Sequence, residues 1–271
     1  MQKALIVWGG WEGHQPRECA DIVARLLSKE GFSVGVADST SAFADPNLGR
    51  FDLITPIVTM STITSEECQN LSNTVVRGTG LAGFHGGMAD SFRNEPDYQF
   101  MVGGQWVAHP GNIIPYRITI TKRDDPITGI EDFDYRSEQY YMHVDPSNEV
   151  LATTIFEGKH CSWIDGVVMP VVWKRRHGAG KVFYCSLGHT AAEFDVTPMR
   201  ILILRGMLWA ARDLPPRGPG RVETGKIVNR CSGTSLTVKG AGLDWRRTCP
   251  TTVWSGRTRP QENMGGYRVI G

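Results

Sequence analysis

The chain has 271 residues, a formal net charge of +1 and an ordinary hydrophobic fraction of 41%. This length suits one large domain or a domain with an appendage, and the composition favours neither disorder nor a coiled coil. No apolar run approaches the roughly 20 residues that cross a membrane. The segment from Met1 to Trp8 lacks the apolar region and cleavage site of a signal peptide, so we expect a cytoplasmic protein.

Charge is divided unevenly along the chain. From residue 214 onward, ten Arg and Lys stand against three Asp and Glu, which gives +7 and leaves −6 for the first 213 residues. The basic part is rich in Gly, Arg, Thr and Pro and shows no sustained periodicity. A basic tail can bind nucleic acid, but the missing aromatic–basic interleaving does not favour that function. We expect a domain over residues 1–213 and a loosely ordered or anomalous tail over residues 214–271.

The first 90 residues alternate strands with helices. The apolar residues between Pro16 and Gly31 recur at helical spacing, and Thr64 with Glu67 predicts a capping box for a second helix. Short continuous apolar runs predict buried parallel strands at Lys3–Trp8, Phe32–Val36, Leu53–Val58 and Gly80–Phe84. Strands separated by helices indicate an α/β fold with a mostly parallel central sheet.

After His109 the alternation loosens. A last amphipathic helix is predicted over Pro198–Arg212. Strands separated by long loops are predicted at Arg117–Thr121, Val150–Phe156, Val167–Trp173 and Lys181–Cys185. Long ordered loops in a compact α/β domain usually carry function.

Histidines gather in the loops that are expected to leave the carboxyl ends of the strands. Ligands of open α/β sheets bind at this edge. Five of the seven histidines fall there or in the long loops that follow: His14, His85, His109, His143 and His189. We therefore expect a histidine-lined pocket at the carboxyl edge of the sheet.

The sharpest local signal is the segment Gly83-Phe84-His85-Gly86-Gly87. A strand, a tight turn and a helix in this order form a nucleophile elbow, which usually carries Ser or Cys. Here the position holds His85, so no thiol is present for His189, in the loop after a late strand, to activate. Cysteine-dependent amide transfer is therefore not expected. We take His85, His189 and the nearby acid Glu138 as the catalytic candidates.

Several longer segments together resemble one family. They are VWGGWEGHQP, GFHGGM, FRNEPDYQFMVGGQWVAHPGN, SEQYYMHVDP, IDGVVMPVVWKRRHGAGKVFYCSLGH and RGMLWAAR. The chain from Lys3 to about Asp213 is similar to the trehalose-utilisation ThuA-like family, a branch of the class I glutamine amidotransferase-like superfamily without the cysteine nucleophile. The resemblance implies a flavodoxin-like three-layer sandwich. It also implies a role in the use of trehalose and related disaccharides, with a partner dehydrogenase that oxidises the sugar to a 3-keto form.

This resemblance gives the remaining polar and aromatic residues an expected role in sugar binding. The substrate-binding candidates are Trp11, His14, Asp90, Arg93, Gln105, His109, Gln139, Tyr141 and His143. The histidines could also bind a divalent zinc or manganese ion, with His14, His85 and His143 as the first choices. Otherwise they act as acid, base and hydroxyl donors. A nucleotide cofactor is not expected, because G-x-G-x-x-G and Gly-Lys-Ser motifs are missing.

Two functions remain open at this point. The first is an enzyme that isomerises or cleaves a disaccharide or its 3-keto derivative, with histidine as the base beside a ketone. The second is a non-catalytic sugar-binding or regulatory protein that keeps an amidotransferase-like shell. The sequence leaves the oligomeric state open, a homo-oligomer included.

Overall fold

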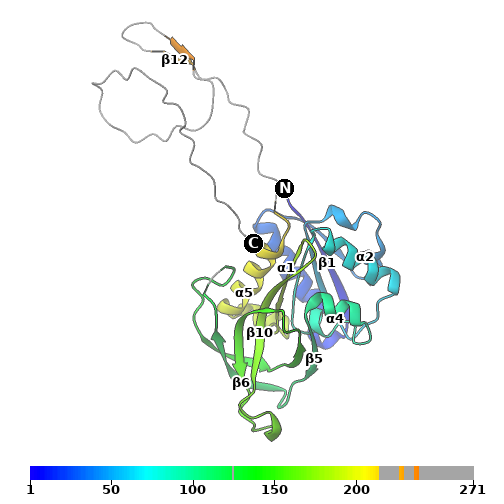
Figure 1. Cartoon of the computed structure of the whole chain (residues 1–271), viewed down its shortest axis with the longest axis vertical. Coiled ribbons are helices and arrows are strands. Elements are labelled where there is room, and N and C mark those ends of the chain that lie inside the picture. Colours follow the sequence, from blue (N-terminus) through cyan, green and yellow to red (C-terminus); the bar gives the residue numbers. More distant parts are fainter. Residues whose placement is uncertain (124, 214–225, 229–234, 238–271) are drawn as a thin grey trace, which may run out of the picture. The chain divides into compact units, whose positions relative to one another are not determined.

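The computed structural model describes residues 1–123, 125–213, 226–228 and 235–237 (Figure 1). The chain divides into two compact units, residues 1–215 and 216–271. In the second unit, β12 (Lys226–Val228) pairs antiparallel with β13 (Ser235–Thr237). The expectation of a loosely ordered tail otherwise falls on residues outside the described ones. Within the described chain, no helix is long and apolar enough to span a bilayer.

A nine-stranded sheet forms the centre of the first unit, with the strand order β2-β1-β3-β4-β11-β10-β9-β6-β7. The strands at the β2 end are parallel to one another. They are β1 (Lys3–Gly10), β2 (Ser33–Ala37), β3 (Leu53–Thr59), β4 (Gly80–Phe84) and β11 (Gly180–Cys185). β3 and β4 are buried along their whole length, which explains their continuous apolar sequences. The predicted α/β fold with a central parallel sheet is confirmed.

Beyond β11 the sheet continues with antiparallel strands. They are β10 (Val168–His177), β9 (Glu149–Ile155), β6 (Ile113–Ile120) and β7 (Phe133–Glu138). A separate small sheet pairs β5 (Gly104–Ala108) with β8 (Tyr141–Val144). The sequence predicted neither of these two strands nor β7, and it placed β6 too late. These strands are partly exposed, and β7 is rich in polar residues, whereas the strands of the parallel half predicted from the sequence are continuous apolar runs.

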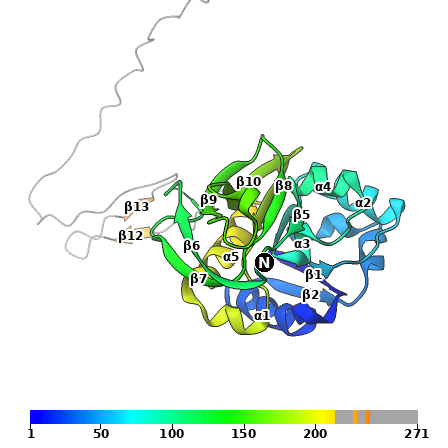
Figure 2. The ribbon, with the colours of Figure 1, turned by 90° about the horizontal axis from the view of Figure 1, so that it is seen from below.

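Helices cover both faces of the sheet (Figure 2), and a hydrophobic cluster lies on each face. Ala4 and Ile6 of β1 pack in one hydrophobic cluster, and the alternate residues Leu5 and Val7 pack in the other. The first cluster includes α1 (Pro16–Lys29) and α5 (Thr197–Ala210). The second includes α2 (Ser65–Val76), α3 (Gly86–Ala89) and α4 (Pro96–Val102). Short 3₁₀ turns are η1 (Glu12–His14), η2 (Thr40–Ala44), η3 (Leu48–Arg50), η4 (Ser162–Ile164) and η5 (Ala191–Asp195).

The predicted capping box at the start of α2 is confirmed. The Glu67 backbone N–H donates to Thr64 Oγ1 at 3.2 Å, and the Thr64 N–H donates to Glu67 Oε2 at 2.9 Å. We expect Thr64→Ala to lower the free energy of unfolding by about 1 kcal/mol, because one helix N–H loses its acceptor. Urea denaturation would measure this loss, with Thr62→Ala as the matched control outside the cap. Equal midpoints for the two variants would contradict the prediction.

Candidate functional site

The elbow after β4 positions the first residue of the site. His85 has φ +47° and ψ −146°, a backbone region that costs energy for any residue other than glycine. Its backbone N–H donates to the Cys185 carbonyl at 2.7 Å, and its side chain is buried. A Cβ on Gly86 would lie 2.6 Å from the His14 ring, so glycine is required where these segments meet. The predicted turn is present, with His85 at its tip.

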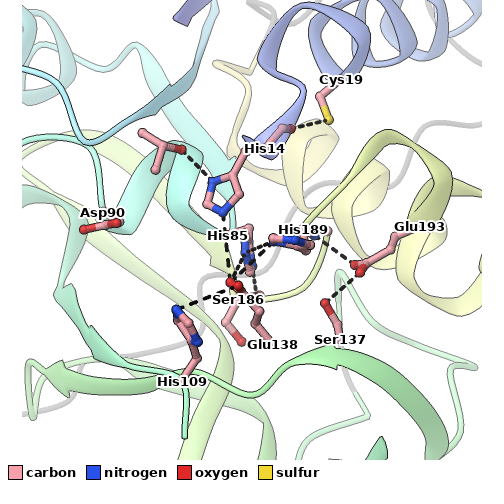
Figure 3. Close-up of polar contacts among 12 residues, drawn as sticks. His14, Cys19, His85, Asp90, His109, Ser137, Glu138, Ser186, His189 and Glu193 are labelled. Atoms are coloured by element: carbon pink, nitrogen blue, oxygen red, sulfur yellow. Dashed lines mark hydrogen bonds and ion pairs between the residues drawn. The ribbon is translucent and has the colours of Figure 1, made fainter. Parts of the chain in front are cut away.

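Four side chains, those of His14, His85, Glu138 and His189, converge at this point (Figure 3). His14 belongs to η1 after β1, Glu138 ends β7, and His189 lies in the loop after β11. Each of the four offers one ligand atom, and all four atoms lie within 4.8 Å of one another. His85 Nε2 is 3.2 Å from both Glu138 Oε2 and His189 Nδ1. Glu138 Oε2 is also 3.4 Å from His189 Nδ1 and 4.0 Å from His14 Nε2.

The position of Glu138 requires a strongly curled sheet. β7 is the edge strand, five places from β4 in the strand order. In a flat sheet, five spacings of about 4.8 Å would separate these strands by about 24 Å. The contact between Glu138 and His85 shows that the antiparallel half turns back toward the carboxyl edge of the parallel half. The site is therefore formed by both halves of the sheet.

Hydrogen bonds outside the cluster fix how its protons are arranged. His85 Nδ1–H donates to the Ser186 carbonyl at 2.8 Å, so Nε2 of the neutral ring presents a lone pair to the cluster. His14 Nδ1 is paired with Thr59 Oγ1 at 2.9 Å, which directs Nε2 of that ring inward. The inner atoms of His85, Glu138 and His189 can all act as acceptors. A shared proton or a cation is required to hold them together.

Charges within the cluster separate its pKa values. Burial, followed by the charges of His85 and His189, lowers the pKa of His14 to about 3, so this ring is neutral. Burial disfavours a charged His189, but the hydrogen bond and charge of Glu138 outweigh burial and raise its pKa. Burial would raise the pKa of Glu138, but its close contacts with the His189 and His85 rings lower it below its usual range. Without a metal, Glu138 therefore favours its carboxylate form, and the His189 ring takes up a proton more readily than an ordinary histidine.

Aromatic and charged residues surround this cluster. Tyr140 is buried and stacks on His85 with ring centroids 4.1 Å apart. His109 Nε2 lies 3.8 Å from Glu138 Oε1, and the His109 ring is 5.5 Å from Trp106. The Arg93 guanidinium lies over the Trp106 ring at 4.6 Å. These residues form one side of the site, next to the four converging side chains.

Two further predicted residues lie near this group. Trp11 is 46% exposed and makes an edge contact with His14, with ring centroids 4.8 Å apart. Asp90 is buried and accepts hydrogen bonds from Arg93 on both carboxylate oxygens, at 2.6 and 2.8 Å. Its negative charge is therefore already paired within the protein.

Comparison with known proteins identifies the family. A profile of the ThuA family, described as trehalose utilisation, matches residues 3–210. The chain belongs to the ThuA family. No curated protein sequence matches it.

Solved structures show the same fold as this ThuA family member. A ThuA-like protein from Bacteroides uniformis ATCC 8492 is 20% identical, with a TM-score of 0.64 over 77% of this chain and 91% of its own. Another from Parabacteroides merdae ATCC 43184 is 16% identical, with a TM-score of 0.63 over 79% and 93%. A cytoplasmic protein from Salmonella typhimurium LT2 is 12% identical, with a TM-score of 0.52 over 78% and 100%.

Some predicted site residues of this ThuA chain lie away from the cluster. His143 is exposed on β8, where it pairs in register with Gln105 of β5. Gln139 donates to Thr154 Oγ1 at 2.8 Å and lines a separate cavity of about 560 Å³. Tyr141 packs edge-on against Phe156, with ring centroids 5.7 Å apart.

The expected metal-ligand set therefore changes. His14 and His85 are brought together as expected, but His143 is not part of the group that could hold a metal ion. Glu138 and His189 complete that group instead. Four residues that contact the cluster or the segments that carry it were not predicted from the sequence: Thr59, Tyr140, Ser186 and Glu193. Only Glu193 had a local signal, because it follows His189 by four residues.

Proposed function

We propose that this ThuA family member is a metal-dependent enzyme that acts on a disaccharide or its 3-keto derivative. The observation that carries the proposal is the convergence of ligand atoms from His14, His85, Glu138 and His189 within 4.8 Å of one another. Neutral imidazoles with one carboxylate are a donor set suited to zinc or manganese. The family description, trehalose utilisation, supports a disaccharide as the substrate class.

The spacing of the donor atoms fits a divalent cation. Zn–N bonds of about 2.0–2.1 Å place neighbouring ligand atoms of a tetrahedral site about 3.3 Å apart. Of the six separations here, those among His85, Glu138 and His189 are 3.2, 3.2 and 3.4 Å. Glu138 lies 4.0 Å from His14, and all six separations are within 4.8 Å. The outer hydrogen bonds of His85 and His14 orient the rings, as second partners of metal-binding histidines do.

Within this proposal, one group of residues binds the metal and another residue transfers a proton. A divalent cation in the cluster would supply a Lewis acid that polarises a sugar carbonyl or hydroxyl oxygen. The four converging side chains would hold that cation, which leaves His109 as the imidazole that moves a proton. The His109 side chain is 29% exposed and lies beside Glu138. An imidazole there can take the proton from the carbon next to a ketone, as isomerisation or eliminative cleavage requires.

Substrate binding would use the aromatic and charged residues at the edge of the cluster. The partly exposed ring of Trp11 offers a face on which a sugar ring can stack. Arg93 is held in place by both oxygens of Asp90 and by Trp106, so its remaining N–H groups are fixed donors for hydroxyl groups. A partner sugar dehydrogenase would supply the 3-keto substrate.

Two buried cysteines, Cys19 and Cys185, do not favour the amide-transfer chemistry of related folds. Cys185 is fully buried, and burial raises the pKa of its thiol to about 12. Burial also raises the pKa of Cys19 to about 12, with a smaller contribution from Glu18. A thiol with such a pKa supplies almost no thiolate at neutral pH. The elbow residue itself is His85.

Elemental analysis and a turnover assay test the proposal together. The protein, purified without a histidine tag, is expected to contain close to one zinc or manganese ion per chain. It is also expected to convert a 3-keto disaccharide, and removal of the metal by a chelator should abolish turnover. Readdition of the same metal should restore it.

Other outcomes would each remove a defined part of the proposal. A metal-free protein that still turns over the 3-keto sugar would leave acid–base catalysis by the histidines alone. A protein that binds sugar without turnover, with or without metal, would support the non-catalytic sugar-binding alternative.

A further inference from the structure

Glu193 lies just outside the cluster and accepts hydrogen bonds on both of its carboxylate oxygens. It belongs to η5, four residues after His189. Glu193 Oε2 accepts the backbone N–H of His189 at 2.8 Å and also accepts the Tyr135 hydroxyl. Glu193 Oε1 accepts the Ser137 hydroxyl at 2.7 Å. One carboxylate therefore connects the His189 loop to strand β7.

The donors to Glu193 adjoin the residues that converge in the cluster. Ser137 immediately precedes Glu138 and is fully buried. The Tyr135 hydroxyl also accepts the backbone N–H of Gly188 at 3.3 Å, which adds a second link between β7 and the His189 loop. In Figure 3, Glu193 lies between Ser137 and His189, on the far side of His189 from His14. A displacement of Glu193 would therefore change the distance between Glu138 and His189.

The chain at residues 188–193, which carries His189 and Glu193, is also connected to the segment that carries His14. The backbone N–H of Ala191 donates to Gln15 Oε1 at 3.1 Å, and Gln15 follows His14 directly. Segments that carry three of the four converging side chains thus meet at residues 188–193. His85 has its own support, because the backbone N–H at the elbow is bonded to β11.

Glu193 is bonded to hydroxyl and amide donors and not to a cationic side chain. None of the ion pairs among residues 1–123 and 125–213 includes it. A surface ion pair would hold a carboxylate only loosely, but three donors from two chain segments fix both of its oxygens. This arrangement is typical of an outer residue that orients ligands.

We propose that Glu193 is a positioning residue that holds Glu138 and His189 at the separation needed for metal binding. This inference rests on the proposed metal-dependent function. Its effect is transmitted through Ser137, Tyr135 and the His189 backbone, and Glu193 itself does not touch the metal or the substrate. Removal of such outer partners of metal ligands typically weakens metal binding by about 10- to 100-fold.

The test compares Glu193→Gln with the wild-type protein in a titration with Co²⁺, whose visible absorption reports the ligand geometry. The substitution removes the negative charge of the carboxylate, so the hydrogen bonds from His189, Ser137 and Tyr135 lose their charge-assisted strength. We expect the Kd for Co²⁺ to rise about 10- to 100-fold and the absorption bands to shift. Glu67→Gln is the matched control, because glutamine retains the capping box of α2 and Glu67 is remote from the cluster contacts.

The outcomes separate this inference from the proposed function. Cobalt binding by the wild type with an unchanged Kd and spectrum in Glu193→Gln would overturn the role of Glu193 alone. A wild-type protein that binds neither cobalt nor zinc would overturn the metal proposal and this inference with it. Circular dichroism melts of both variants establish that they are folded. Tyr135→Phe, which removes one donor and keeps the carboxylate, is expected to give a smaller shift of the same sign.

Discussion

His85→Ala is expected to eliminate metal binding by the cluster and the turnover that depends on it. His85 Nε2 makes the two shortest contacts in the cluster, each 3.2 Å, to Glu138 and His189. Removal of this ring takes away one metal ligand. It also removes the Nε2 atom that Glu138 and His189 both contact. The affinity for zinc or manganese should fall by more than the roughly 10- to 100-fold that a lost outer partner costs. Elemental analysis and competition with a chelator would measure the change.

A second histidine provides the control for this variant. His177 is half-buried at the end of β10 and pairs with Ser72 Oγ at 3.0 Å, away from the cluster. His177→Ala should keep the full metal content and turnover, although the two substitutions remove the same side chain. Full metal content in His85→Ala would show that the metal is held elsewhere and would refute the assigned ligand set.

Metal affinity should fall about tenfold for each pH unit below the pKa of His189. The pKa of this ring is raised above its ordinary 6.5 by Glu138, so below that pKa the ring carries a proton that a metal must displace. His14, with a pKa of about 3, is already neutral, and the lowered pKa of Glu138 keeps it ionised. The proton of His189 is therefore displaced by the metal, and this displacement alone should lower the affinity about 100-fold over the two pH units below 6.5.

Calorimetric titration in buffers of different ionisation enthalpy would count the released protons directly. A value near one supports the pairing of Glu138 with a protonated His189. A value near two would mean that a second histidine of the cluster is also charged in the free protein, and a value near zero would mean that His189 is already neutral. The Glu193→Gln variant provides a comparison in which the donor set is unchanged but its support is weaker.

Local sequence was sufficient to predict the strands of the parallel half of the sheet and part of the candidate site. Continuous apolar runs specify strands that are buried on both faces, as in β3 and β4. The glycines around His85 specify the turn at its position, because a Cβ on Gly86 or Gly87 would lie too close to His14 or Ile57. The rule that ligands bind at the carboxyl ends of parallel strands then selects the loops of His14 and His189.

The antiparallel half could not be predicted in the same way. Glu138 and His143 are five residues apart, yet one joins the cluster and the other is exposed on β8. The choice depends on pairing between β6 and β7 and between β5 and β8, which joins distant parts of the chain. Gln139, the residue directly after β7, bonds Thr154 of β9, whereas Glu138 at the end of β7 joins the cluster. Such register is set by long-range contacts and leaves little trace in local sequence.

The curled sheet has a consequence for how a metal would enter and leave. β7 is an edge strand, and edge elements open locally at a lower free energy than the centre of a sheet. Glu138 ends this strand, whereas His85 follows the central strand β4. Separation of β7 from η5 would therefore remove one ligand and leave the rest of the fold intact. The rate of metal exchange would then follow the opening of this edge, and a bound ion would in turn suppress that opening.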